Sequence, residues 1–179
     1  LAYVKDDQKA GLHLQSDFYR DKIASKKEKT VVIISDALRY EAAKELSLKF
    51  QDDPNCEIDM SAMMGTLPSY TAVGMAALLP HDELTMIEDK DHKVLVDGEP
   101  TTYTEQKEKI LKKANEKSAA ILVENILNMS AKELKEFTAG KEVIYIYHNK
   151  VDSTGENSRS ENTVLTATGQ AIDEIYSLV

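Results

Sequence analysis

The sequence has no tryptophan, a single cysteine and no apolar run that approaches the length of a membrane span. Because Cys56 has no second cysteine to pair with, an internal disulfide is excluded, which suits a reducing cytoplasm. The N-terminus carries no signal-peptide pattern. These absences predict a cytoplasmic protein with no membrane partner. We interpret Cys56 as a small half-buried side chain at the start of a strand rather than as a nucleophile.

The sequence also has fewer basic than acidic residues. Lysine and arginine total 22 against 31 aspartate and glutamate residues, which gives a formal net charge of −9. This balance argues against a broad basic surface for nucleic acid on the chain. A phosphate substrate would need a metal ion or a local basic pocket to overcome the negative field.

The length of 179 residues favours one domain that can carry a sizeable insertion. The chain begins at Leu1 rather than at a methionine and ends at Val179, directly after a helical pattern, so we expect it to be part of a longer protein. We interpret residues 1–27 as a helical connector from an upstream domain, with a helix at 13–25, and expect the core over 28–179.

Two strand–helix pairs open the predicted core. The β-branched run TVVIIS at 30–35 predicts a buried strand of the kind found in parallel sheets, and a helix is expected at 38–50. The alternating CEIDMSAM at 56–63 predicts a second strand. The segment at 69–79 predicts a helix capped by Ser69. Strands that alternate with helices are typical of an α/β sheet with crossover connections.

Residues 82–140 differ in character, and we interpret them as a mostly helical insertion outside the central sheet. They include a predicted hairpin at 93–103 that turns at Asp97-Gly98. Three helices are expected after the hairpin, at 104–117, 119–129 and 130–140, the last with a capping box formed by Ser130 and Glu133.

The core resumes with a third strand, KEVIYIY at 141–147, and a helix at 161–178. The predicted fold class is therefore α/β, with a mostly parallel sheet flanked by helices and one insertion.

Polar side chains follow each of the three predicted core strands. Asp36 follows the first strand, Thr66 the second, and Asp152 and Glu156 the third. Taken singly, each has an ordinary structural explanation as a helix cap, a turn residue or a loop residue. However, the carboxyl ends of parallel strands lie along one edge of the sheet, where ligands bind in open α/β folds. We therefore expect these residues to form one site.

The residue types indicate phosphoester chemistry. Carboxylates at strand ends hold hard or borderline divalent cations. Beside such a cation the Thr66 hydroxyl would have a lowered pKa and could attack phosphorus. Two metal ions about 4 Å apart would stabilise both the attacking and the leaving oxygen. A helix that begins near Ser69 would present its N-terminus to the same anion.

Three motifs carry a family resemblance that covers roughly residues 28–179. The motifs VVIISDALRYE, GTLPSYTAVGMAALLPH and YHNKVDSTGE resemble, in the same order, segments of the alkaline phosphatase superfamily and its nucleotide pyrophosphatase/phosphodiesterase branch. They are most similar to the PglZ family, the alkaline-phosphatase-like component of BREX phage-defence systems. This resemblance implies that Thr66 is the nucleophile and that Asp36 holds one metal ion and helps to activate Thr66. It places Asp152 and Glu156 on the other metal ion, with other BREX proteins as partners.

The sequence departs from the family pattern in two ways. Glu156 stands where the phosphodiesterase branch has a histidine, so manganese or magnesium become candidates beside zinc. The superfamily also completes its two-metal site with an Asp-His pair and a further histidine, which come after the helix at which this chain stops. Asp91-His92 precedes the third core strand and has the wrong order. We therefore expect this stretch to be inactive by itself, within a parent protein that is a metal-dependent phosphoester hydrolase.

Two other functions stay open at this point. The domain could be a scaffold that docks other defence components around a vestigial site. Alternatively, Asp36 could accept a phosphoryl group, although the second acid or lysine that such folds place nearby is lacking. The substrate class also stays open between a nucleic-acid phosphodiester, a small nucleotide and a phosphoprotein. We expect His148 and Asn149 to fix the loop or support a metal ligand, and Arg39 to form a surface ion pair.

Overall fold

The central sheet has the strand order β2-β8-β7, formed by Thr30–Ser35, Val143–His148 and Ser118–Leu122. Strands β2 and β8 run parallel. The Thr30 amide donates to the Glu142 carbonyl (2.8 Å) and the Asp36 amide to the His148 carbonyl (2.9 Å), so the same register holds at both ends. All six residues of β8 are buried, as expected for a central parallel strand. The predicted α/β class and both strands are confirmed.

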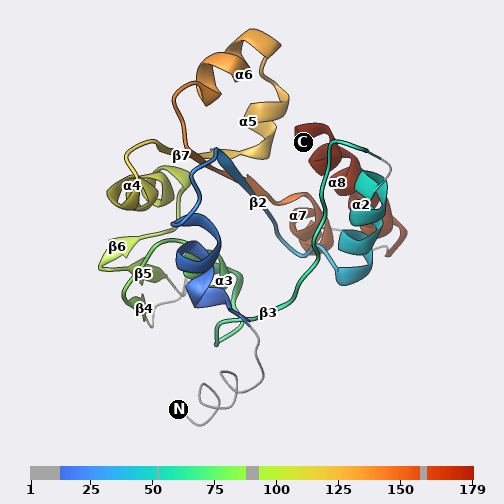
Figure 1. The fold of residues 1–179 in the computed structure, drawn as a ribbon. Coiled ribbons are helices and arrows are strands. Elements are labelled where there is room, and N and C mark those ends of the chain that lie inside the picture. Colours follow the sequence, from blue (N-terminus) through green and yellow to red (C-terminus); the bar gives the residue numbers. More distant parts are fainter. Residues whose placement is uncertain (1–12, 52, 88–92, 158–160) are drawn as a thin grey trace. The chain divides into compact units, whose positions relative to one another are not determined.

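A computed structural model of the chain (Figure 1) describes residues 13–51, 53–87, 93–157 and 161–179, without the side chains of 156, 157 and 161. Its contacts divide the chain into two units. The first unit contains Leu1–Val32 and Ala62–Ile146, and the second contains Ile33–Ser61 and Tyr147–Val179. The division falls within β2 and β8. None of the helices among the described residues has the length and apolar character needed to cross a bilayer.

Three helices of the second unit pack together (Figure 1). Helix α8 (Glu161–Leu178) lies against both α2 (Tyr40–Gln51) and α7 (Lys150–Asn157). Five small or aliphatic side chains on the inward faces of α2 and α8 are buried: Ala42, Ala167, Ala171, Ile172 and Ile175. At the rim the rings of Phe50 and Tyr176 lie 4.9 Å apart, and Lys49 pairs with Asp173 (2.5 Å). The predictions of α2 and α8 from apolar spacing are confirmed.

In the first unit, the residues predicted as a helix at 13–25 form a two-residue strand followed by two short helices. Strand β1 (His13–Leu14) pairs in parallel with β3 (Met63–Met64). A 3₁₀ helix, η1 (Gln15–Asp17), and a short π-helix, η2 (Tyr19–Ile23), follow. The helix prediction is therefore wrong at its first two residues, because pairing with a distant strand overrides local propensity there. Residues 1–12 of the predicted connector lie outside the described residues.

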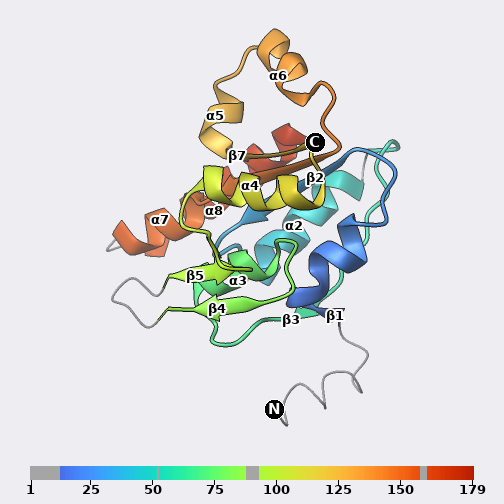
Figure 2. The same cartoon turned by 90° about the vertical axis from the view of Figure 1, so that its left-hand side faces the viewer.

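A second small sheet lies beside α3 (Thr71–Ala77) in the first unit (Figure 2). It has the order β4-β5-β6, formed by Leu84–Met86, Val94–Val96 and Glu99–Pro100 in antiparallel pairs. The predicted hairpin turn is confirmed, because Asp97 and Gly98 both have positive φ, at 50° and 79°. Pro100 lies on the edge strand β6, where no ladder hydrogen bond from its nitrogen is needed.

The remaining helices of the first unit are α4 (Thr104–Ala114), α5 (Val123–Leu127) and α6 (Ala131–Thr138). The capping box of α6 is confirmed: Ser130 Oγ accepts from the Glu133 amide (3.3 Å) and Glu133 Oε2 accepts from the Ser130 amide (2.8 Å). Gly140, with a φ of 68°, follows the end of this helix as predicted.

Two further predicted elements are wrong. Strand β3 covers only Met63–Met64, so Met63 is the one residue of the strand predicted at 56–63 that is in a strand, and Cys56 does not begin one. The first part of the helix predicted at 119–129 is strand β7, which belongs to the central sheet and not to an insertion outside it. A short apolar run is compatible with either a buried helix or a buried strand, and the sheet partner decides between them. That an insertion begins near residue 82 and ends near residue 140 stays a prediction.

Two glycine substitutions should have opposite effects on stability. Gly98 requires a positive φ, so Gly98→Ala should lower the free energy of unfolding by about 1 kcal/mol. Gly169 lies within α8, and a Cβ there would meet no atom within 4 Å. Gly169→Ala should therefore raise the free energy of unfolding by about 0.5–1 kcal/mol. Urea unfolding of both variants tests this; the same sign for both would contradict the assigned backbone conformations.

Candidate functional site

Asp36 lies directly after β2, at the carboxyl end of the central sheet. Its amide is held by the carbonyl of His148, the last residue of the neighbouring strand β8. Its Oδ1 accepts from the Ala37 amide (2.9 Å), and Ala37 has a φ of 58°. Helix α2 begins only at Tyr40, so this hydrogen bond lies in the turn between β2 and α2 and not at the start of the helix. The carboxylate is half-buried at the strand end where the sequence predicted it.

Asp152 and Glu156 lie in a helix, whereas the sequence suggested a loop composition. Helix α7 starts at Lys150, directly after β8 and Asn149, and Asp152 occupies its first turn. The hydroxyls of Ser153 and Thr154 donate to the Lys150 carbonyl (3.3 and 2.8 Å), so these two residues belong to the helix. The Asp152 side chain is half-buried, and the Glu156 side chain lies outside the described residues.

The parallel pairing of β2 and β8 brings Asp36 and the start of α7 to the same edge within the second unit. Asp36 is bonded to His148, and Asp152 follows four residues later along the chain. Asp36 and the helix turn that carries Asp152 thus follow neighbouring strands, and their convergence on one site stays a prediction. Thr66 belongs to the first unit.

Thr66 lies in the turn between β3 and α3. Its side chain is half-buried and its amide donates to Gln15 Oε1 (2.9 Å). The Leu67-Pro68 peptide bond that follows is cis. Helix α3 begins at Thr71 with Tyr70 at the cap position, so the prediction that Ser69 caps this helix is wrong.

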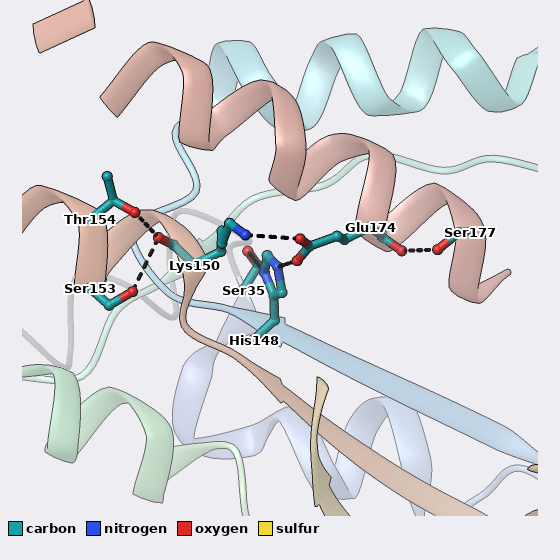
Figure 3. A network of polar contacts seen from close by, with 7 residues as sticks. All are labelled: Ser35, His148, Lys150, Ser153, Thr154, Glu174 and Ser177. Atoms are coloured by element: carbon teal, nitrogen blue, oxygen red, sulfur yellow. Dashed lines mark hydrogen bonds and ion pairs between the residues drawn. The ribbon is translucent and has the colours of Figure 1, made fainter. Parts of the chain in front are cut away.

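A buried histidine joins four elements of the second unit (Figure 3). The His148 side chain is 0% exposed, and Nδ1 shares a 2.8 Å hydrogen bond with Ser35 Oγ. On the other side of the ring, Nε2 lies 3.1 Å from Glu174 Oε2 of α8. Lys150 Nζ, at the start of α7, lies 3.1 Å from Glu174 Oε1. The network therefore connects the ends of β2 and β8 to α7 and α8.

The charges of this network favour an ionised Glu174. Partial burial alone would raise the pKa of the Glu174 carboxyl, but hydrogen bonds from Lys150 and His148 outweigh burial and lower the pKa below its ordinary value. An ionised carboxylate only accepts hydrogen bonds, so His148 Nε2 carries the proton. In the neutral imidazole, Nδ1 then accepts from the Ser35 hydroxyl.

The sequence singled out His148 but missed its two partners. Ser35 looked like the last residue of a buried strand, and Glu174 lies 26 residues beyond His148 in a helix with several acidic residues. The apolar spacing of α8 gave a partial signal for Glu174. This residue is next to the buried Ile175 and three residues after the buried Ala171, so it lies near the inward face of the helix. To identify Glu174 as the partner of His148, however, one needs to know how α8 packs against the end of β8.

The donor chemistry at the strand ends fits part of a divalent-cation site. Asp36 and Asp152 supply half-buried carboxylates, the oxygen donors that hard and borderline cations take. Within the described part of the chain, no three His, Cys, Asp or Glu side chains gather closely enough to hold a metal ion. Asp91 and His92 lie outside the described residues.

Comparison with known proteins places the chain in a family. The family model described as the BREX system PglZ alkaline phosphatase-like domain matches residues 18–179. The chain therefore belongs to the PglZ family of alkaline-phosphatase-like domains, as the three sequence motifs predicted.

Two curated relatives agree with this assignment. The chain is 40% identical over 173 residues to the alkaline phosphatase-like protein PglZ of Bacillus cereus (strain H3081.97), which covers 95% of the chain and 20% of that protein. It is 37% identical over 152 residues to the alkaline phosphatase-like protein BrxZ of Escherichia coli O9:H4 (strain HS), covering 85% of the chain and 17% of that protein. The chain thus spans about a fifth of the length of these relatives. No solved structure matches it.

Replacing His148 with phenylalanine should destabilise the second unit strongly. The His148→Phe ring keeps a similar size but leaves Ser35 Oγ and the Glu174 carboxylate without this partner. We expect the free energy of unfolding to fall by about 2 kcal/mol or more. His81→Phe is the control, since the half-buried His81 makes one bond to a backbone carbonyl (2.7 Å) and should cost about 1 kcal/mol. Equal losses in the two variants would contradict the network.

The lowered pKa of Glu174 predicts how acid affects stability. A carboxyl whose pKa is lower in the folded state stabilises the protein above its unfolded pKa, and this contribution disappears as the pH falls through the folded value. Glu174→Gln should therefore flatten the loss of stability below about pH 4.5. Urea unfolding at a series of pH values tests this, with the exposed Glu124→Gln as control. If the free energy of unfolding fell as steeply with acid in Glu174→Gln as in the unaltered protein, the lowered pKa of Glu174 would be refuted.

Proposed function

We propose that this domain belongs to a metal-dependent phosphoester hydrolase of a BREX phage-defence system, with Thr66 as its nucleophile. The observation that supports the proposal most directly is the joint position of Asp36 and of the helix turn that carries Asp152. Two adjacent parallel strands lead into carboxylates at one edge of the sheet. This is the edge at which open α/β folds bind ligands.

In the proposed site, Asp36 holds one metal ion, and Asp152 and Glu156 hold the other. The resemblance to the superfamily favours zinc, and the oxygen-rich donors leave manganese or magnesium as alternatives. Divalent cations bound there would lower the pKa of the nucleophile and offset the negative charge of the phosphate. Such compensation is needed because the chain has a net charge of −9.

Thr66 has the role of attacking atom in this proposal. Its Oγ forms a bond to phosphorus as the bond between phosphorus and the leaving oxygen breaks, and its proton passes to solvent. Water then hydrolyses the phosphothreonine and restores the hydroxyl. The Thr66 segment matches the nucleophile motif of the resemblance, and the side chain is half-buried, as suits a group that must meet substrate.

The substrate and partners follow from the family and are also proposals. A phosphoester is the expected substrate, either a nucleotide or a nucleic-acid phosphodiester, and other BREX proteins are the expected partners. The reaction would take place in the cytoplasm, where a defence system meets phage nucleic acid.

Hydrolysis by the protein in its natural full length tests the proposal. We expect turnover of a chromogenic phosphodiester that depends on zinc or manganese. Thr66→Ala and Asp152→Ala should each lower kcat/KM by at least about a hundredfold. Thr104→Ala and Asp59→Ala are matched controls, because they remove a threonine hydroxyl and an aspartate carboxylate outside the proposed site.

Metal binding and turnover, measured together, distinguish the hydrolase hypothesis from the scaffold hypothesis. Retained metal binding with turnover that is equal in the parent, Thr66→Ala and Asp152→Ala would refute the nucleophile. Absence of both metal binding and turnover from the parent would favour a domain that only docks other defence components.

A further inference from the structure

Gln15 lies beside the turn that carries Thr66, although 51 residues separate them in the chain. Strands β1 and β3 pair in parallel, with His13 opposite Met63 and Leu14 opposite Met64. Because the two segments run in the same direction in this register, Gln15, the residue after β1, lies beside the Gly65-Thr66 turn that follows β3. The contact is thus set by backbone pairing and not only by a long side chain.

Both ends of the Gln15 amide are used. Oε1 accepts from the Thr66 amide (2.9 Å), and Nε2 donates to the Gly74 carbonyl in α3 (3.2 Å). A backbone amide only donates and a backbone carbonyl only accepts, so these partners fix which end of the side chain is oxygen. One side chain therefore ties the backbone of Thr66 to helix α3.

Glycine occurs at two positions where the chain approaches Gln15. A Cβ added at Gly74 would lie 3.4 Å from Gln15 Nε2, and one at Gly65 would lie 3.9 Å from Oε1. These are ordinary van der Waals distances, so both glycines lie directly beside the Gln15 side chain. The segment on both sides of Thr66 is thus arranged around this glutamine.

Packing does little to fix the Thr66 turn. Residues 65 and 67–72 are exposed, and Leu67 and Tyr70 have exposed fractions of 61% and 48%. A turn with few buried apolar contacts opens at low cost in free energy. A nucleophile, however, has to be held close to its attack geometry, and a displacement of about 1 Å can lower the rate about a hundredfold. Hydrogen bonds from a neighbouring segment would supply the missing restraint.

We infer that Gln15 is a positioning residue for the nucleophile, which clamps the Thr66 backbone to α3 through its two amide hydrogen bonds. This inference rests on the proposed function of Thr66. It extends the site to a residue that precedes the family match at 18–179. Gln15 touches neither substrate nor metal in this role; it restricts the motion of the turn that presents the hydroxyl.

The Gln15→Ala variant of the natural full-length protein tests the inference. We expect kcat for the chromogenic phosphodiester to fall roughly ten- to hundredfold while KM changes less than about twofold, because the attack geometry is lost and binding is kept. We also expect the Thr66 amide to exchange with solvent about tenfold faster, as measured by hydrogen exchange. Gln15→Glu keeps the oxygen that accepts from Thr66 and should restore much of the protection at this amide.

Gln106→Ala is the matched control. Gln106 Oε1 also accepts from a backbone amide at 2.9 Å, that of Tyr103 at the start of α4, so the variant loses the same kind of bond elsewhere in the first unit. It should leave kcat and Thr66 exchange unchanged. An equal fall of kcat in Gln15→Ala and Gln106→Ala, or unchanged Thr66 exchange in Gln15→Ala, would overturn the inference.

Thr66→Ala in the same assay separates this inference from the proposed function. If Thr66→Ala abolishes turnover and Gln15→Ala leaves kcat intact, the nucleophile stands and the clamp is refuted. If Thr66→Ala keeps full turnover, the proposed function fails, and the role of Gln15 in positioning a nucleophile fails with it. Faster Thr66 exchange in Gln15→Ala would in that case show only that Gln15 protects the Thr66 amide.

Discussion

The parallel pairing of β2 with β8 is the constraint on which the candidate site depends. It aligns the carboxyl ends of the two strands, so that Asp36 and the first turn of α7 emerge at one edge. Buried His148 reinforces this edge, because its ring nitrogens bind Ser35 and Glu174 on opposite sides. A polar side chain with no exposed surface is stable only when its hydrogen bonds are satisfied, so strands and helices here are held in one arrangement. Rigid support of this kind suits a site whose carboxylates must keep a fixed geometry.

The segment that carries the proposed nucleophile, Thr66, is held by a different kind of contact. The Thr66 turn is short of buried contacts, and its restraint comes from polar bonds to Gln15 and through Gln15 to α3. The two parts of the proposed site thus have separate supports: the buried His148 network at the ends of β2 and β8, and Gln15 beside the proposed nucleophile. In each case the supporting residue lies outside the conspicuous acidic and hydroxyl residues of the motifs.

Sequence reasoning succeeded where local pattern and tertiary environment agree. The β-branched run of β2, the Asp97-Gly98 turn, the Ser130 capping box and the apolar spacing of α8 each determine their structure locally. The family assignment also followed from the order of three motifs.

Prediction from the sequence failed where a distant partner decides the structure. His13–Leu14 is extended because it pairs with β3, and Ser118–Leu122 is a strand because the central sheet accepts it. The same holds for the site: Asp36 and Asp152 could be proposed from strand ends, whereas Glu174 and Gln15 acquire their roles only through the contacts of the folded chain.

The central claim is that the carboxyl ends of β2 and β8 carry metal ligands. The most direct test is a crystal structure of the natural full-length protein grown with zinc or manganese, with anomalous scattering used to locate the metal ions. We expect anomalous peaks within coordination distance, about 2.0–2.2 Å, of carboxylate oxygens of Asp36 and Asp152. Occupied metal sites elsewhere in the protein, with both carboxylates free of metal, would contradict it.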